Sequence, residues 1–164
     1  MLMKKHKYDI CIRSYQPTDA KVLAQIYYDT IHTVNSTDYT KEQLDAWAPA
    51  STLNDLSQWK NKWSRTAPLV ATVNETVVGF AEFEETGHID CFYCHHLWIG
   101  RGVGHALMRA IESKVREKGI KRIYAEVSIT AKPFFERAGF QAIKRQTVIC
   151  RNVAMENFIM ENYP

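Results

Sequence analysis

The chain has 164 residues, which is enough for a sizeable core, and we treat residues 1–164 as a single domain. Apolar residues make up 46% and charged residues 24%, as in soluble globular proteins. The net charge of +3 is too small to indicate a nucleic-acid partner. No run of about 18 apolar residues is present, so no membrane span or membrane partner is predicted.

The first fifteen residues, MLMKKHKYDICIRSY, lack the apolar stretch of a secretory signal, so we expect a cytoplasmic protein. Thiols stay reduced in that compartment. We therefore expect unpaired cysteines that act as small, buried hydrophobic side chains. The four cysteines are Cys11, Cys91, Cys94 and Cys150.

One predicted strand and three predicted helices make up the first part of the chain. Residues 9–15 alternate apolar and polar side chains, which is typical of a strand. Apolar residues at helical spacing then predict a helix over 18–34. A short helix over 40–47 and a third helix over 53–64 follow.

The hydrophobic period then changes to two. Residues 68–73, 76–83 and 88–94 read as three strands joined by short turns, which predicts an antiparallel meander. A helix over 102–118 follows, with an apolar stripe on one face and Gly119 at its C-terminal end.

The last part of the chain predicts a strand over 121–127 and a short helix over 130–139. Residues 140–150 and 153–160 then predict a closing hairpin. This order of elements predicts an α/β fold of the mixed (α+β) kind, with a sheet and helices on its faces.

Cys91, Cys94 and His95 match the C-x-x-C-H spacing of haem attachment, and Cys–His pairs also occur at zinc sites. Both cysteines lie within a predicted strand, where residues three apart point to opposite faces, about 10 Å apart along the strand. A tetrahedral zinc needs its sulfur ligands about 3.8 Å apart. Haem attachment would also require export. We therefore predict neither a metal nor a haem.

Residues 100–104, GRGVG, connect a predicted strand to a predicted helix. Glycines let backbone N–H groups approach an anion, and the helix N-terminus and Arg101 add positive charge. A Rossmann fingerprint does not fit, because Leu107 occupies its third small position, and no Walker Gly-Lys-Ser/Thr is present. A phosphate-binding turn and a purely structural turn both remain open.

Two stretches match the motifs of one family. Ile99 to Gly104 fits Gln/Arg-x-x-Gly-x-Gly/Ala, with Ile99 in place of the polar residue. Residues 128–140, SITAKPFFERAGF, fit Asn-x-x-Ala-x-x-Phe-Tyr-Glu-x-x-Gly-Phe, with Ser128 for Asn and Phe135 for Tyr. On these motifs, the chain resembles the GNAT superfamily of N-acetyltransferases over nearly its full length. The phrases SYQPTDA and YTKEQLDAWAP further resemble its YafP-like bacterial branch.

The resemblance implies a GNAT fold, with a central, mostly antiparallel sheet of six to seven strands and helices on both faces. The sheet would be splayed between its fourth and fifth strands, and acetyl-CoA would lie there as the cosubstrate. Phe134 and Phe140 are interpreted as core. The residues implied to hold acetyl-CoA are the backbone of Phe92, Tyr93 and Cys94, the phosphate turn Ile99, Gly100, Arg101, Gly102, Val103 and Gly104, and the flanking Ser128, Lys132 and Phe135.

The implied reaction is direct transfer of acetyl from the thioester to an amine, which must first lose a proton. The Cys94 amide is the candidate donor to the oxyanion. The first candidates for the base are Asp90, in phase with Cys94, and Glu126, in phase with Ser128; Glu82 is the third. Each of them could instead be an exposed carboxylate without a role, with the proton lost through ordered water.

In many relatives a Tyr at the position of Phe135 protonates the departing thiolate. Phenylalanine cannot do so, and the candidate replacements are Tyr93 and Tyr39. The alternative is that the thiolate leaves unassisted, because thiols have a pKa near 8.5.

The acceptor is expected near the first loop and the short helix, where His32, Asp38, Tyr39 and Trp47 gather. An aromatic wall with a carboxylate suits a cationic amine. The alternative is that Tyr39 and Trp47 only pack the helix onto the sheet.

Three functions follow from these features. The first is N-acetylation of a small-molecule amine. The second is acetylation of protein amines, which would need an open groove. The third is a non-catalytic acyl-CoA-binding module, which Phe135 and Ile99 keep open. The family often forms homodimers, so the resemblance is also compatible with a homodimer.

Overall fold

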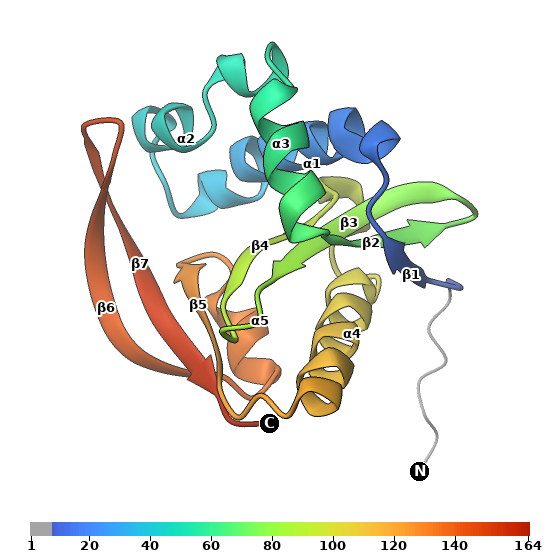
Figure 1. Ribbon diagram of the computed structural model, residues 1–164. Coiled ribbons are helices and arrows are strands. Elements are labelled where there is room, and N and C mark those ends of the chain that lie inside the picture. Colours follow the sequence, from blue (N-terminus) through green and yellow to red (C-terminus); the bar gives the residue numbers. More distant parts are fainter. Residues whose placement is uncertain (1–7) are drawn as a thin grey trace.

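The computed structural model describes residues 8–164 (Figure 1). Residues 1–7, on which part of the signal-peptide interpretation rests, lie outside the described residues. Strands and helices follow one another in the predicted order. The strands are β1 (Cys11–Ser14), β2 (Leu69–Val73), β3 (Thr76–Phe83), β4 (Ile89–Cys94), β5 (Ile123–Ser128), β6 (Gln141–Cys150) and β7 (Val153–Asn162). The α-helices are α1 (Ala20–Thr33), α2 (Lys41–Trp47), α3 (Ser57–Thr66), α4 (Val103–Lys118) and α5 (Lys132–Arg137).

The strands form two antiparallel sheets rather than one continuous sheet. The larger sheet has the order β1-β2-β3-β4 and the smaller one the order β5-β7-β6. The two sheets meet at a single parallel bridge between His88 and Tyr124, where the Tyr124 N–H donates to the Gly87 carbonyl at 3.0 Å. Beyond the bridge β4 and β5 separate: β4 stays in the larger sheet, and β5 pairs along its length with β7 in the smaller one. The splay between the fourth and fifth strands is therefore confirmed.

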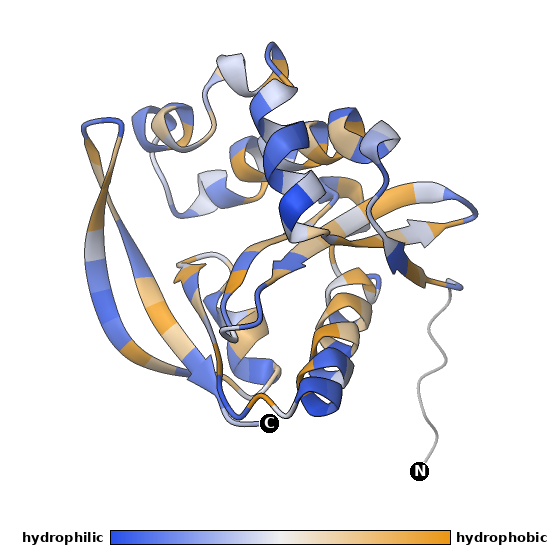
Figure 2. Ribbon diagram, in the orientation of Figure 1, coloured by the Kyte–Doolittle hydropathy of each residue, from blue (hydrophilic) through white to orange (hydrophobic). Residues whose placement is uncertain are grey.

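Helices cover both faces of the larger sheet, as predicted. On one face α1 and α3 bury Leu23 and Trp63 against Phe80 of β3. On the other face α4 buries Leu107 and Ile111. The strands of this sheet are largely hydrophobic, whereas α3 is mostly hydrophilic and packs mainly through its tryptophans (Figure 2). The sheet is thus buried on both sides.

Local signals explain where the helices of the first part begin. Thr40 caps α2, because its side chain accepts from the Gln43 N–H while the Gln43 side chain accepts from the Thr40 N–H. The third helix was predicted from residue 53, but it begins at Ser57. Residues 50–53 instead form a separate 3-10 turn after Pro49.

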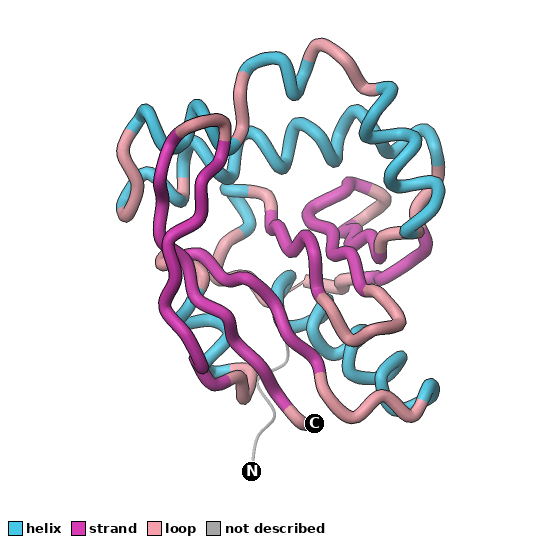
Figure 3. Tube along the Cα trace, turned by 60° about the vertical axis from the view of Figure 1, so that its left-hand side comes forward, coloured by secondary structure: helices cyan, strands magenta, loops and turns pink. Residues whose placement is uncertain are grey.

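The long β6–β7 hairpin extends along one side of the molecule, and its tip lies beside α2 (Figures 1 and 3). At the tip, the Arg151 guanidinium donates to the Ala46 carbonyl at 2.7 Å. Midway along β7, the Tyr39 hydroxyl donates to the Glu156 carbonyl at 2.6 Å and accepts from the Ile129 N–H at 3.0 Å. The hairpin is therefore attached both to α2 and to the end of β5.

All four cysteines are unpaired, as expected. The expectation that they are buried is wrong for Cys11, which is exposed on the edge strand β1. Cys91 is buried, and Cys94 and Cys150 are partly buried. Among residues 8–164, no helix is both long enough and apolar enough to cross a membrane.

The junction of the two sheets predicts a specific stability effect. Gly87 has φ of +93°, and a β-carbon there would lie 2.1 Å from the Arg122 carbonyl oxygen. We expect Gly87→Ala to lower the free energy of unfolding by about 3 kcal/mol, measured by denaturant titration. Gly119→Ala is the matched control, because Gly119 has φ of +66° but open space around it. Its expected loss is about 1 kcal/mol, and equal losses in the two variants would contradict the prediction.

Candidate active site

A groove of about 480 Å³ lies where β4 and β5 separate, and it continues past the start of α4 to α5. Its walls are mainly apolar and include backbone from both strands. Among the residues predicted to hold acetyl-CoA, those that line it are Phe92, Tyr93, Cys94, Ile99, Gly100, Gly102, Gly104, Ser128 and Phe135.

The pairing of β4 with β3 leaves two β4 amides turned toward the groove. The His95 N–H donates to the Val78 carbonyl at 2.8 Å, and two residues earlier Tyr93 pairs with Phe80. Hydrogen-bonded pairs alternate along an antiparallel ladder, so the N–H and C=O groups of Phe92 and Cys94 point away from β3. The Cys94 carbonyl accepts from the Thr30 hydroxyl at 2.8 Å, which leaves its amide as a candidate donor to a ligand.

The turn before α4 has the geometry of an anion site. Gly100 and Gly102 have φ of 76° and 92°, values that favour glycine. The Ala106 N–H donates to the Gly102 carbonyl, as in the first turn of an α-helix. The backbone N–H groups of residues 102–104 come before this first helical hydrogen bond. They lie at the positive end of the helix dipole, and the turn is open to solvent.

Three residues predicted to hold acetyl-CoA lie outside this lining within the described part of the chain. The Arg101 guanidinium stacks over the Trp98 ring, 5.2 Å from its centroid. Val103 is buried in the core beneath α4. The ammonium of Lys132 lies 2.7 Å from the Glu136 carboxylate on the surface of α5.

Gly104 lets α4 approach α5 closely. A β-carbon at this position would lie 2.9 Å from the Phe134 ring and 3.6 Å from the Cys94 sulfur. Phe134, which we interpreted as core, is instead partly exposed and lines the groove together with the buried Phe135. Phe140 is buried, as expected.

A second cavity, of about 300 Å³, adjoins the groove from the side of α2, α3 and the hairpin. It is walled by aromatic rings, among which Tyr27 packs against Trp59 and Tyr93 with centroids 5.0 and 4.9 Å apart. The residues that line both the groove and this cavity are Trp47, Asp90, Tyr93, Glu126 and Ser128. The two cavities therefore meet at the point where β4 and β5 diverge.

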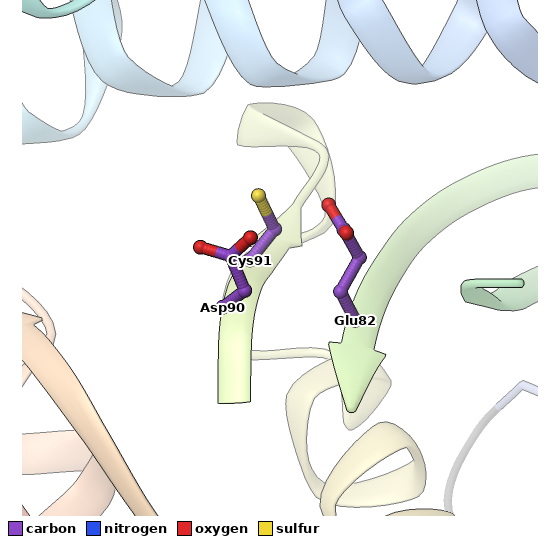
Figure 4. A group of neighbouring side chains, drawn as sticks. All are labelled: Glu82, Asp90 and Cys91. Atoms are coloured by element: carbon purple, nitrogen blue, oxygen red, sulfur yellow. The ribbon is translucent and has the colours of Figure 1, made fainter. Parts of the chain in front are cut away.

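A β-bulge explains how Asp90 reaches the second cavity. Between two paired positions, β3 has one residue, Glu82, and β4 has two, Asp90 and Cys91. If side chains alternated strictly along β4, Asp90 would lie on the same face as Cys94. The extra residue at the bulge turns the Asp90 side chain toward α3, where it meets Lys62. Figure 4 shows the three side chains from the two strands pointing toward one another.

Lys62 of α3 is the shared counter-ion of the two carboxylates in this cluster. Its ammonium lies 2.8 Å from Asp90 Oδ2, 3.2 Å from Glu82 Oε1 and 3.9 Å from Cys91 Sγ. Glu82 is fully buried, and Trp63 donates its indole N–H to the same Oε1 at 2.9 Å. Burial lowers the pKa of Lys62, but the neighbouring carboxylates of Asp90 and Glu82 outweigh that effect and raise it, so the ammonium stays charged.

Glu82, Asp90 and Cys91 place their ligand atoms within 4.8 Å of one another, as a metal site would. Two features make this a poor site for a metal. The Lys62 ammonium already occupies the position of the cation. Burial and Glu82 also raise the pKa of the Cys91 thiol well above its usual value, and a protonated thiol is a weak ligand.

Glu126, on β5, has a different counter-ion. Its Oε2 lies 2.6 Å from Nε2 of His88, whose Nδ1 lies 3.4 Å from Glu84. Burial lowers the pKa of His88, but Glu126, Glu84 and Asp90 outweigh it and raise the pKa above its ordinary value. Unlike Lys62, this partner is an imidazole, which can lose its charge by losing a proton.

The structure separates the residues predicted to bind the acceptor. Trp47 and Tyr39 line the second cavity, and the Tyr39 hydroxyl is already hydrogen-bonded to two backbone groups. The predicted partner His32 lies elsewhere, with Nε2 2.7 Å from the Ala48 carbonyl oxygen and its ring against Tyr28. Burial raises the pKa of Tyr93 well above that of a free phenol, so its hydroxyl stays protonated.

A family model described as the acetyltransferase (GNAT) domain matches residues 35–157, three quarters of the chain. The chain belongs to the GNAT acetyltransferase family. A relative from Escherichia coli (strain K12), the uncharacterized N-acetyltransferase YafP, is 36% identical over 156 residues, which cover 95% of this chain and 97% of the relative. This GNAT protein is therefore an acetyl-CoA-dependent acyltransferase.

Solved structures share the whole fold of this GNAT chain. A GCN5-related N-acetyltransferase from Rhodopseudomonas palustris matches with a TM-score of 0.89 and 32% identity, covering 100% of this chain and 99% of the other. The PaiA N-acetyltransferase from Thermoplasma acidophilum, solved in complex with coenzyme A, matches with a TM-score of 0.75 and 18% identity. The match covers 95% of this chain and 99% of the PaiA chain. At 18% identity, the similarity shows a shared fold.

Sequence reasoning missed several residues that line or adjoin the candidate site. Lys62 and Trp59 lie on a helix that was predicted only as a packing element, and both line the second cavity. His88 was placed in a strand without a role. The available signal was the combination of Glu84, His88 and Glu126, but their proximity depends on the bridge between the two sheets.

The α4–α5 contact predicts how coenzyme A binding depends on Gly104. In Gly104→Ala, the new methyl group would push Phe134 into the groove beside the phosphate turn. We expect the dissociation constant for coenzyme A, measured by titration calorimetry, to rise about tenfold, or ~1.4 kcal/mol. Gly119→Ala, at the other end of the same helix, should leave this constant unchanged. Unchanged affinity in Gly104→Ala would rule out this role of the turn.

Proposed function

We propose that this protein transfers the acetyl group of acetyl-CoA to the amine of a small molecule. One observation carries the proposal: the apolar groove and the aromatic, acidic cavity are lined by five common residues at the splay of β4 and β5. A thioester in the groove and an amine in the cavity would meet there. The residues present fit acetyl-CoA, because the groove offers two outward β4 amides and a glycine turn that a side chain at Gly104 would obstruct.

The size and walls of the second cavity favour a small acceptor. Its volume of about 300 Å³ is at the lower end of the range for small-molecule pockets. The β6–β7 hairpin supplies one wall through Val148, Met155 and Asn157. The attachment of that hairpin to α2 by Arg151 supports a bounded pocket rather than an open groove for a protein tail.

The acetyl-CoA cosubstrate supplies an activated acetyl thioester. The outward amide of Cys94 is proposed to donate to the carbonyl oxygen as negative charge develops on it during attack by the amine. The amide is held at this position by the β3–β4 ladder, so little reorganisation accompanies the reaction. Ser128 Oγ accepts from the Ala131 N–H at 3.0 Å and so shapes the turn that carries the opposite wall.

Of the two carboxylates at the junction, Glu126 is the better proposed base. The Asp90 carboxylate lies 2.8 Å from the Lys62 ammonium, which stays charged, so Asp90 is already engaged in an ion pair. Glu126 is paired with a histidine whose charge can be lost. We therefore assign proton removal to Glu126 and recognition of the acceptor ammonium to Asp90.

Tyr93 is proposed to assist departure of the sulfur, since Phe135 cannot. It lines both cavities, and burial raises its pKa. A phenol with a raised pKa is a hydrogen-bond donor but a weak acid, so Tyr93 would stabilise the leaving thiolate without giving up its proton. The thiolate then takes a proton from solvent.

The proposal is tested by mixing the protein with acetyl-CoA and a panel of small amines and by following the release of free thiol. Turnover on at least one small amine is expected, with N-acetyl product identified by mass spectrometry. Coenzyme A binding without turnover on any small amine or peptide would favour a binding module instead. Turnover restricted to peptide amines would favour a protein acetyltransferase.

Two variants separate the roles of the carboxylates. Glu126→Gln should lower kcat about 100-fold with little change in the acceptor KM, because proton transfer is lost. Asp90→Asn should mainly raise the acceptor KM, by about tenfold, because an ammonium contact is lost. Both are measured by steady-state kinetics. Glu85→Gln is the control, since Glu85 pairs with Lys118 outside both cavities. A reversed pattern of kcat and KM would exchange the two assignments.

A further inference from the structure

His88 lies at the junction of the two sheets, between two carboxylates. Its Nε2 is 2.6 Å from Glu126 Oε2 and its Nδ1 is 3.4 Å from Glu84 Oε2. Its ring stacks on Tyr124 of β5, with centroids 5.1 Å apart and planes 28° apart. Both ring nitrogens therefore face acids, and one of those acids lines the groove and the acceptor cavity.

The backbone holds the imidazole in this position. The His88 carbonyl accepts from the Glu84 N–H at 2.9 Å, and His88 forms the parallel bridge with Tyr124. The His88 side chain is 18% exposed, so solvent reaches the ring but does not surround it. A proton on this ring can therefore exchange with water while the ring stays next to Glu126.

Charged groups near the ring come from each neighbouring element. Glu84 belongs to the β3–β4 connection, Asp90 to β4 and Glu126 to β5, and all three act to raise the pKa of His88. The nearest described cation around the stacked Tyr124 is Arg122, which lies 4.4 Å from that ring and is paired with Glu161. The surroundings of His88 are therefore acidic overall.

We propose that His88 sets the pH above which Glu126 accepts the proton of the acceptor amine. This inference rests on the proposed function, in which Glu126 is the base. When protonated, the imidazolium holds the Glu126 carboxylate in an ion pair, so Glu126 is engaged with His88 rather than with the proton of the acceptor. When the imidazolium loses its proton from Nδ1, Nε2 keeps its hydrogen and can still donate a hydrogen bond to Glu126. The positive charge next to Glu126 is then gone. His88 is thus a positioning residue that acts through Glu126.

The proton balance of the reaction is simple. Glu126 takes one proton from the acceptor ammonium, and the freed electron pair forms the C–N bond as the C–S bond breaks. The nitrogen loses its second proton to solvent when the amide forms, and the sulfur, which leaves with its electron pair, takes one proton from solvent. One net proton is released, and it passes from Glu126 to solvent.

The test compares two neighbouring glutamates. Glu84→Gln removes a carboxylate that faces His88, and it should lower the pKa of the imidazole by about half a unit. Glu85→Gln removes the same charge one residue away, from a side chain that pairs with Lys118, and should have no effect. Two quantities are measured in each protein: the pKa of His88 by NMR titration of the imidazole, and the acidic limb of the kcat–pH profile.

The expected result is that the acidic limb and the His88 titration coincide in the wild type and move down together in Glu84→Gln. His88→Gln, which can still donate a hydrogen bond to Glu126 but does not titrate, should lose this limb and retain activity at low pH. If the pKa of His88 shifts in Glu84→Gln but the acidic limb of the kcat–pH profile does not, the inference about His88 is overturned and the proposed function still stands. Absence of turnover by the wild type on every amine overturns the proposed function, and this inference falls with it.

Discussion

The separation of β4 from β5 is the constraint on which the rest of the structure depends. Within the described residues, one bridge joins the two sheets, between His88 just before β4 and Tyr124 of β5, and the Arg122 carbonyl leaves no room for a side chain at Gly87 beside it. From there the larger sheet follows β4 and the smaller sheet follows β5. The divergence leaves the β4 amides without a neighbouring strand, and it opens the groove in which a long, flexible cosubstrate can replace the missing strand.

The charges around this opening are arranged in two ion pairs of different kinds. The buried Glu82 and the half-exposed Asp90 share one ammonium, that of Lys62. Removing the ammonium would leave a buried carboxylate uncompensated, and breaking such a pair costs about 3–5 kcal/mol. Glu126 is paired instead with a histidine near the surface. A permanent countercharge suits a structural and binding role, whereas a titratable one suits proton transfer.

The second cavity depends on contacts between distant parts of the chain. Its aromatic rings come from α1, α2 and α3, from Tyr39 before α2 and from Tyr93 of β4, and the closing hairpin supplies another wall. Tyr39 joins these parts, because its hydroxyl bonds to β7 on one side and to the end of β5 on the other. The hairpin therefore contributes to the shape of the proposed acceptor cavity, while the residues proposed to act in the reaction lie on the strands at the splay.

The order of strands and helices, the antiparallel meander and the two family motifs could be read from the sequence, because each depends on residues close together in the chain. Local patterns predicted the glycine turn before α4 and the capped start of α2 in the same way. Helix boundaries near Pro49 were less well determined, since a 3-10 turn and a helix have similar local requirements. Tertiary structure alone decided that the strands form two sheets, that a bulge turns Asp90 toward Lys62, and that His88 lies beside Glu126. The contact of His88 with Glu126 joins residues 38 positions apart, and such contacts contribute energy only when the chain has packed.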